Sequence, residues 1–410
     1  MRLLLVSQYF WPESFRINDV IRTLVQKGVS VDVLTGKPNY PQGIIFEGYG
    51  AWGCQKDNYE SACVYRVPLI PRGRSGLRLA INYISFLVSG AFLAPFLLRR
   101  KKFDVIFVYG LSPILQAIPA IVMGKLKGCP VVLWVQDLWP ASLSATGHVK
   151  NRFVLKLVEL AVRYIYKRAD LILVQSEAFI EPVRAMAWDT EVVYYPNSVD
   201  DSFSSPFTGV TPLVPGMSAK FPIVFAGNIG IAQAVEVIVG AADQLRNFPD
   251  IQFVVLGDGS RRQWMLEEVE KLGLNNVHLP GSFPLDTMPG FMQQAAALLV
   301  TLSDEEIFTY TVPSKVQAYL AAGRPILACL NGAGAELVKS AKAGIAVPAE
   351  DAAALAKAIL ALQAIPREER DSMGRNGAAY FARNFSHEML VDRLIELLKV
   401  SFRVQKDMTE

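Results

Sequence analysis

The feature that most constrains this chain is the regular alternation of short apolar, β-branched runs with stretches of helical periodicity. The first series of runs, which we predict to be strands, covers residues 3–6, 30–34, 64–69, 105–109, 131–135, 171–174 and 192–195. Runs this apolar are typical of parallel strands that are buried on both faces. The helical stretches between them begin and end with ordinary signals, as in 114–127, which follows Pro113 and stops before Gly128. The alternation predicts an α/β doubly wound sheet.

A second series of strand-like runs follows a stretch without apolar periodicity. Residues 200–220 are rich in Ser, Pro, Gly and Thr, a composition that favours an interdomain linker. The later runs cover 223–226, 251–256, 277–279, 298–301, 326–328 and 345–347. The chain has 410 residues, more than the roughly 250 to 300 at which one hydrophobic core stops growing. We therefore predict two doubly wound domains, 1–205 and 206–385, and a final amphipathic helix, 386–405, that returns to the first domain.

Composition excludes several classes of protein. Forty-one basic and 38 acidic residues leave a net charge of +3, which argues against general nucleic-acid binding. The four cysteines form no CxxC pair and only three histidines are present, so neither a disulfide framework nor a metal site is expected. The N-terminus enters a predicted strand directly and lacks the pattern of a signal peptide, so we expect a cytoplasmic location.

One segment, residues 79–98, is long and apolar enough to be a transmembrane helix candidate. Basic residues precede it at Arg72, Arg74 and Arg78 and follow it at 99–102. Polar residues and Pro95 within the segment, and basic residues at both ends, favour instead a helix that lies in the membrane plane or packs in the core. We expect the basic residues to face an anionic membrane surface, with a solvated charged rim as the alternative.

Glycine-rich loops follow two strands of the second domain. After 223–226 the chain reads GNIGIAQA and enters a helix, and after 251–256 it reads GDG. Glycine lets the backbone approach an anion closely, and the positive end of a helix stabilises a diphosphate without a metal. Both loops are also compatible with ordinary turns that bind nothing.

A third block, VPSKVQAYLAAGRP at 312–325, predicts a short helix. Pro313 and Ser314 begin it, Lys315 lies in its first turn, and Gly323 ends it. A lysine in the first turn opposes the helix dipole, and an anionic ligand there would offset the conflict. A solvated surface lysine is the alternative.

Two blocks of the first domain follow predicted strands. In QYFWPESFRIN, residues 8–18, Arg16 enters a helix three residues after Glu13 and could donate to a phosphate, or form a surface ion pair with Glu13. In VQDLWP, residues 135–140, Asp137 could orient an acceptor hydroxyl or accept its proton, or it could cap a helix.

These blocks resemble the family 4 glycosyltransferases, which have the GT-B fold, and especially the bacterial O-antigen and capsule enzymes that transfer N-acetyl-L-fucosamine. The resemblance covers nearly the whole chain through the ordered blocks QYFWPESFRINDV, LTGKPNYPQG, VQDLWPAS, AGNIGIAQAVE, LGDGSRR and VPSKVQAYLAAGRPILA. It implies two Rossmann-like domains facing across a cleft. It also implies retaining transfer of a sugar such as L-FucNAc from a UDP-sugar, with no cofactor or metal, to an undecaprenyl-diphosphate-linked saccharide at the inner face of the membrane.

The resemblance also implies roles for individual residues. Catalytic or acceptor-facing positions are Asp137, Glu13 and Arg16. Donor-binding positions are Gly227, Asn228, Gln233, Asp258, His278, Phe283, Glu306, Ser314 and Lys315, with 278–283 bordering the base.

The chain departs from the family pattern in two places. Tyr310 and Ala318 stand where many members carry two glutamates, and Asp304, Glu305 and Glu306 are close enough to replace the first. Asn228 and Ile231 stand where Arg and Lys are common, which shifts phosphate binding toward Lys315, Arg16 and backbone amides.

Two other functions remain open alternatives. One is a catalytically silent nucleotide-binding subunit of a polysaccharide assembly complex. The other is a nucleotide-sugar 2-epimerase, although the VPSKVQAY and VQDLWP blocks do not resemble the sequences of that family. A dinucleotide oxidoreductase is disfavoured because the first predicted strand is followed by Ser7, Gln8 and Tyr9 and not by G-x-G-x-x-G.

Overall fold

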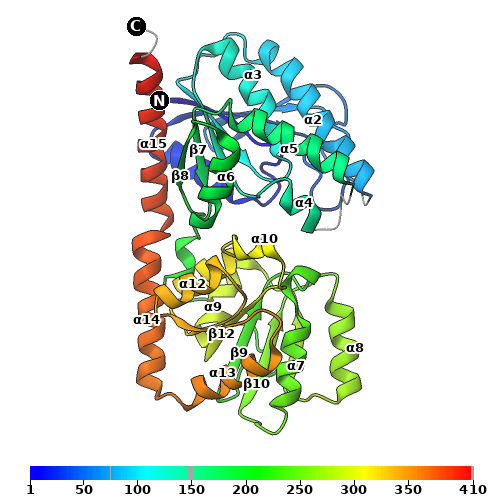
Figure 1. Cartoon of the computed structure of the whole chain (residues 1–410), viewed down its shortest axis with the longest axis vertical. Coiled ribbons are helices and arrows are strands. Elements are labelled where there is room, and N and C mark those ends of the chain that lie inside the picture. The colour runs from blue at the N-terminus through cyan, green and yellow to red at the C-terminus, as the bar shows by residue number, and fades with distance from the viewer. Residues whose placement is uncertain (74, 146–150, 408–410) are drawn as a thin grey trace. The chain divides into compact units, whose positions relative to one another are not determined.

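The computed structural model describes residues 1–73, 75–145 and 151–407 (Figure 1). Arg74, part of the predicted basic flank, lies outside the described residues. The chain forms two compact units, one of Met1–Pro196 together with the chain from Glu388, the other of Asn197–His387.

The first unit is built on an eight-stranded sheet in the order β3-β4-β2-β1-β5-β6-β7-β8. Its strands are β1 (Arg2–Val6), β2 (Ser30–Gly36), β3 (Gln55–Tyr59), β4 (Ala62–Val67), β5 (Val105–Gly110), β6 (Val131–Val135), β7 (Leu171–Val174) and β8 (Glu191–Tyr194). All pairs are parallel except β3 with β4. Every strand predicted for this unit is present. The edge strand β3 was not predicted, because its polar sequence carries no apolar pattern.

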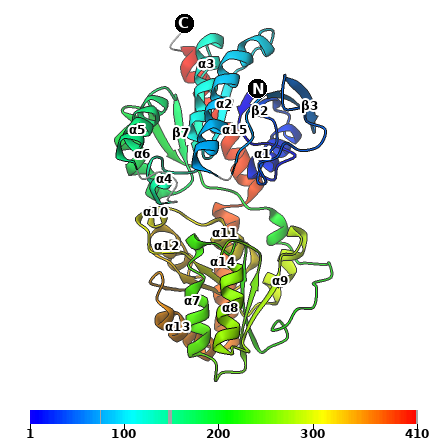
Figure 2. The same ribbon diagram turned by 90° about the vertical axis from the view of Figure 1, so that its right-hand side faces the viewer.

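Helices cover both faces of this sheet. They are α1 (Arg16–Gln26), α2 (Gly76–Leu97), α3 (Ala117–Lys127), α4 (Ala141–Ala145), α5 (Arg152–Tyr166), α6 (Ile180–Ala187) and α15 (His387–Asp407). On one face, Leu3 and Leu5 share a core with Leu390 and Leu394 of α15. On the other face, α3 packs close to Val131, and α2 lies beside α3 (Figure 2). The final helix therefore belongs to the first unit, as its amphipathic pattern predicted.

Helix α2 exposes most of its apolar surface. Its buried residues are Asn82, Phe86, Gly90 and Ala94, which recur every four residues and so form one narrow face. Among the described residues it is the one helix long and apolar enough, by length and composition, to cross a membrane.

The second unit has a six-stranded, all-parallel sheet in the order β11-β10-β9-β12-β13-β14. Its strands are β9 (Phe221–Ala226), β10 (Ile251–Leu256), β11 (Val277–Gly281), β12 (Ala297–Thr301), β13 (Ile326–Cys329) and β14 (Gly344–Val347). Its helices are α7 (Glu236–Gln244), α8 (Arg262–Leu272), α9 (Met288–Gln294), α10 (Glu306–Thr309), α11 (Ser314–Ala322), α12 (Ala333–Ser340), α13 (Ala352–Ala364) and α14 (Arg367–Asn384).

The stretch 200–220 belongs to the second unit and is not a separate linker. Phe203 is buried in that unit's core, and Val214 and Met217 pack against the same cluster. The units divide between Pro196 and Asn197, ahead of the boundary expected at 205. Composition was misleading here because a few apolar side chains anchor a segment that is otherwise polar.

Each sheet has a point where the strand order reverses. In the first unit it lies between β1 and β5, and in the second between β9 and β12. Ligands of doubly wound folds bind beyond the carboxyl ends of the strands at such points. The loops after β1, β5 and β6 carry Glu13, Ser112 and Asp137, and those after β9 and β12 carry residues 227–235 and 302–305.

Candidate functional site

Lys315 is the most unusual residue at the switch point of the second unit. Its Nζ lies 3.7 Å from the centroid of the Phe225 ring and has no hydrogen-bond partner among the described residues. Burial lowers the pKa of this ammonium to about 7. A buried cation without a counter-charge is unfavourable by itself, and an anionic ligand would stabilise it.

The position of Lys315 is fixed by its helix. The Tyr319 hydroxyl, one turn further along α11, accepts a hydrogen bond from the Ala226 N–H at 3.0 Å. This contact holds the helix against the end of β9, and Lys315 then lies over Gly227. A Cβ added at Gly227 would come within 2.6 Å of Lys315 Cε, so the lysine side chain would have to move. Neither Tyr319 nor Phe225 was singled out from the sequence, because their roles come from contacts between distant segments.

The two glycine-rich loops of the second unit pack directly on each other. Ile229 N–H donates to the Asp258 carbonyl at 2.8 Å, and a Cβ at Gly257 would lie 1.9 Å from the Gly227 carbonyl oxygen. The Asn228 Nδ2 donates to Gln233 Oε1 at 3.0 Å, within the first loop. The structure therefore brings Gly227, Asn228, Gln233, Asp258 and Lys315 into one cluster.

Three more of the predicted donor-binding residues lie in the segments that follow β11 and β12. Ser314 is exposed at the first position of α11, and Glu306 is exposed at the start of α10, where its carboxylate accepts a hydrogen bond of 3.5 Å from Tyr310. Phe283 follows the carboxyl end of β11 and packs on Phe291.

His278 is not brought to the loops. It lies inside β11 with its Nε2 2.7 Å from Gln252 Oε1, which comes from the start of β10. Only the end of the stretch 278–283 thus reaches the loops beyond the carboxyl ends of the strands, and His278 does not.

In the first unit, Glu13 is a buried carboxylate that binds backbone. Its Oε1 accepts hydrogen bonds from the N–H groups of Asn39 and Tyr40 at 2.8 and 2.7 Å, and its Oε2 accepts from Phe10 N–H. Burial raises the pKa of Glu13, and these N–H donors oppose the rise. Both oxygens bind backbone N–H groups, and the surface ion pair with Arg16, the alternative considered for these residues, does not form.

Arg16 is partly exposed at the start of α1 and pairs with Asp19 at 3.4 Å. The Asn18 side chain bridges the loop between β1 and α1. Its Oδ1 accepts a hydrogen bond from Trp11 N–H, and its Nδ2 donates one to the Glu13 carbonyl. Of Glu13, Arg16 and Asn18, Arg16 is the most exposed and so the most accessible to a ligand.

Asp137 lies two residues beyond β6, beside the loop after β5. Its Oδ2 accepts hydrogen bonds from the Ser112 N–H at 3.1 Å and Oγ at 2.8 Å, and the Ser112 Oγ also accepts from Trp139 Nε1. Burial raises the pKa of Asp137, and Ser112 opposes the rise. Burial raises the pKa of the Tyr109 phenol, Arg16 lowers it, and Asp137 raises it further.

Within residues 1–73, 75–145 and 151–407, no group of three or more His, Cys, Asp or Glu side chains is arranged to hold a metal ion.

Two family models match the chain, one in each unit. Residues 14–198 match the model described as glycosyl transferase 4-like domain, and residues 220–364 match the model described as glycosyl transferases group 1.

Individual proteins match along most of their length. WcaI of Escherichia coli (strain K12), named as a colanic acid biosynthesis glycosyl transferase, is 26% identical over 344 residues, 79% of this chain and 82% of WcaI. The 2-deoxystreptamine N-acetyl-D-glucosaminyltransferase of Streptomyces fradiae is 26% identical over 95% of this chain and 97% of its own. The structure of Anabaena HepE in complex with UDP superposes with a TM-score of 0.70 at 14% identity, covering 98% and 100% of the two chains. These matches confirm the GT-B fold with its two Rossmann-like units.

Proposed function

Because the chain is a glycosyltransferase with a 4-like domain and a group 1 domain, we propose that it builds a cell-surface polysaccharide. The proposed donor is a UDP-sugar, in particular an N-acetylated deoxy amino sugar such as L-FucNAc. The proposed acceptor is an undecaprenyl-diphosphate-linked saccharide. WcaI, named for colanic acid biosynthesis, supports the polysaccharide, and the UDP complex of HepE supports a UDP-sugar as the donor.

The observation that carries the donor assignment is the unpaired Lys315 ammonium beside Gly227. An ammonium in a poorly solvated place, together with backbone amides of a glycine-rich loop, suits the diphosphate of a nucleotide-sugar. The same groups would stabilise the negative charge that develops on the diphosphate as it leaves. This arrangement needs no metal ion to hold the phosphates.

We propose transfer with retention, by attack of the acceptor hydroxyl on the face from which the diphosphate leaves. The bond between the anomeric carbon and the diphosphate oxygen breaks, and a bond to the acceptor oxygen forms. The acceptor proton passes to the leaving diphosphate, and Asp137, held by Ser112, orients the hydroxyl. Trapping a covalent glycosyl-enzyme would overturn this mechanism.

A location at the inner face of the membrane is part of the proposal. Helix α2 exposes an apolar stripe, and basic residues follow it at 99–102. Helix α5, whose apolar surface was not predicted, exposes Phe153, Leu157 and Leu160 on one side of the helix. Apolar helix faces bordered by basic residues bind anionic membranes by burial and by charge.

The test is a screen of the purified protein with UDP-, GDP- and dTDP-sugars and a lipid-linked acceptor, following nucleotide release. Acceptor-dependent release of UDP from one amino sugar is the expected result. Nucleotide binding without turnover across the whole panel would support the silent subunit in place of the transferase.

A further inference from the structure

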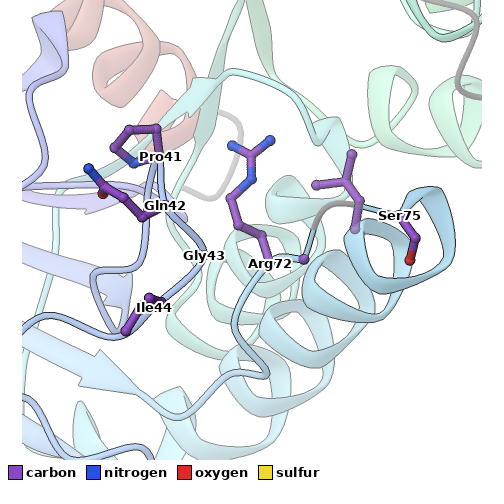
Figure 3. A pocket seen from close by; sticks show the side chains of 8 residues that line it. Pro41, Gln42, Gly43, Ile44, Arg72 and Ser75 are labelled. Atoms are coloured by element: carbon purple, nitrogen blue, oxygen red, sulfur yellow. The ribbon is translucent and has the colours of Figure 1, made fainter.

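The first unit contains a pocket of about 580 Å³ that none of the predicted site residues lines (Figure 3). The lining residues come from two loops and the first turns of α2, and they include Gln42, Gly43, Ile44, Arg72 and Ser75. In the close view, the Arg72 side chain lies between the loop of Gln42 and the start of α2.

One asparagine holds the two loops together. Asn39 Oδ1 accepts from Arg72 N–H at 2.9 Å, and the Asn39 carbonyl accepts from Gly43 N–H at 2.7 Å. Gly43 has φ +75, and a Cβ there would lie 2.1 Å from the Arg72 carbonyl oxygen. Since Glu13 binds the Asn39 N–H, the buried carboxylate supports the pocket wall from beneath. These contacts join the two loops that form the pocket walls.

The charge in this pocket is not neutralised. Arg72 forms no ion pair with a carboxylate among the described residues, and its guanidinium lies 4.8 Å from the centre of the Tyr40 ring. A ring face positions a guanidinium without using its N–H donors. Those donors remain available to an anion, and a planar fork of N–H groups matches phosphate oxygens well.

An apolar stripe begins at Leu77, two residues after Ser75, which lines the pocket. The exposed residues along this side of α2 are Leu77, Ile81, Ile84, Val88, Phe92 and Phe96. Their spacing of three or four residues places them on one side of the helix, which extends away from Ser75. A cationic pocket at one end of an exposed apolar stripe is complementary to an amphiphile with an anionic head and a hydrocarbon chain.

Tyr83 of α2 lies near the loop that carries Asp137. Burial raises the pKa of the Tyr83 phenol to about 12, and the same phenol is influenced by Arg72, which lowers its pKa, and by Asp137, which raises it. Tyr83 also contacts the Trp139 ring, at 6.3 Å between centroids. The Trp139 Nε1 donates to Ser112 Oγ, which donates to Asp137, so contacts of α2 lead from Tyr83 to the loop of Asp137.

We propose that this pocket binds the diphosphate of a polyprenyl-linked acceptor through Arg72, with the hydrocarbon chain leaving along the exposed stripe of α2. The inference rests on the proposed function for the class of acceptor, and it assigns the part of the molecule that recognises it. Arg72 is a binding residue here, and Asn39 and Glu13 position the loop that faces it.

The test uses undecaprenyl diphosphate in phosphatidylcholine nanodiscs as the probe. Nanodiscs of phosphatidylcholine alone, and nanodiscs in which phosphatidylglycerol supplies the same charge, are the comparison. The wild-type protein should bind the probe discs more tightly than either comparison. Arg72→Ala should lose about tenfold or more of that gain. Arg184→Ala, which removes an exposed arginine of α6 that pairs with Glu181, should retain it, and UDP binding should be unchanged in both variants.

Three results would overturn the proposal. In the first, undecaprenyl diphosphate does not increase the affinity of the wild type for nanodiscs. In the second, it increases the affinity of Arg72→Ala by the same factor. In the third, phosphatidylglycerol gives the same Arg72-dependent increase, which would assign the pocket to bulk anionic lipid. Sugar transfer is measured separately on the same proteins. Transfer to a lipid-linked saccharide that does not depend on Arg72 refutes the pocket alone, whereas Arg72-dependent binding without any transfer refutes the proposed function alone.

Discussion

The Lys315 ammonium lies over the face of the Phe225 ring, 3.7 Å from its centroid, and its side chain closes against Gly227. The ring stabilises the cation only partly, because a quadrupole does not replace a counter-ion or water. The second unit thus holds a preformed positive charge next to a glycine-rich loop. A bound diphosphate would supply the counter-charge that the protein itself does not provide there.

Replacing Lys315 by Met should weaken UDP binding by about tenfold or more, because a charge-assisted hydrogen bond to phosphate is lost. Titration calorimetry of the purified protein measures the dissociation constant. Lys339→Met removes an exposed lysine that pairs with Glu336, and it should leave the constant unchanged. Equal UDP affinity in the wild type and Lys315→Met would show that the ammonium does not contact the phosphates.

UDP affinity should fall as pH rises above 7. Burial holds the pKa of the free Lys315 at about 7, and a bound diphosphate must raise it. Binding is therefore strongest where the lysine is already protonated, and it weakens above that pKa by up to about tenfold per pH unit. Lys315→Arg stays charged and corrects for titration of UDP itself. The UDP affinity of the wild type is divided by that of Lys315→Arg at each pH. If this ratio does not change from neutral to mildly alkaline pH, the prediction is wrong.

Gly227→Ala should disturb the site by steric contact. The added methyl group would meet Lys315 Cε at 2.6 Å, at a residue whose φ is +130. We expect a loss of about 1 kcal/mol or more of stability, together with weaker UDP binding. Gly273 also has a positive φ, but a Cβ added there would meet no atom within 4 Å, so Gly273→Ala is the matched control. It should cost stability without changing the UDP dissociation constant.

The sequence predicted the sheets well because buried parallel strands are apolar along their whole length. It also located the loops of Gly227 and Lys315, since glycine and helix-start signals are local. It did not predict that Phe225 underlies Lys315 or that Asn39 joins Arg72 to Gly43, because such contacts link residues far apart in the chain. The family resemblance implied a catalytic or acceptor-facing role for Glu13, which stays a prediction, and the structure shows both its carboxylate oxygens bound to backbone N–H groups. A carboxylate in a loop has the same sequence signature in either role.

Asp137→Asn should slow sugar transfer while UDP binding stays constant. Asparagine keeps an oxygen that accepts from the Ser112 N–H and Oγ, so the loop geometry is retained and only the negative charge is removed. Since Asp137 orients the acceptor hydroxyl in the proposed mechanism, the rate should fall about a hundredfold or more. Ser112→Ala, which loosens the carboxylate without removing it, should have a smaller effect. Transfer at the wild-type rate by Asp137→Asn would restrict Asp137 to a structural role.

Two glutamate substitutions on α5 should weaken membrane binding. Phe153 and Leu157 are 70% and 52% exposed and lie one turn apart on the same side of the helix, so a charge there does not disturb the core. Each side chain that inserts into lipid contributes about 1.5 to 3 kcal/mol when fully buried. Phe153→Glu with Leu157→Glu should therefore reduce binding to phosphatidylglycerol vesicles about tenfold or more. Leu213→Glu places the same change on a fully exposed leucine of the second unit and should not alter vesicle binding. Unchanged binding by the double variant, with its melting temperature preserved, would remove α5 from the membrane-facing surface and leave α2 to account for attachment.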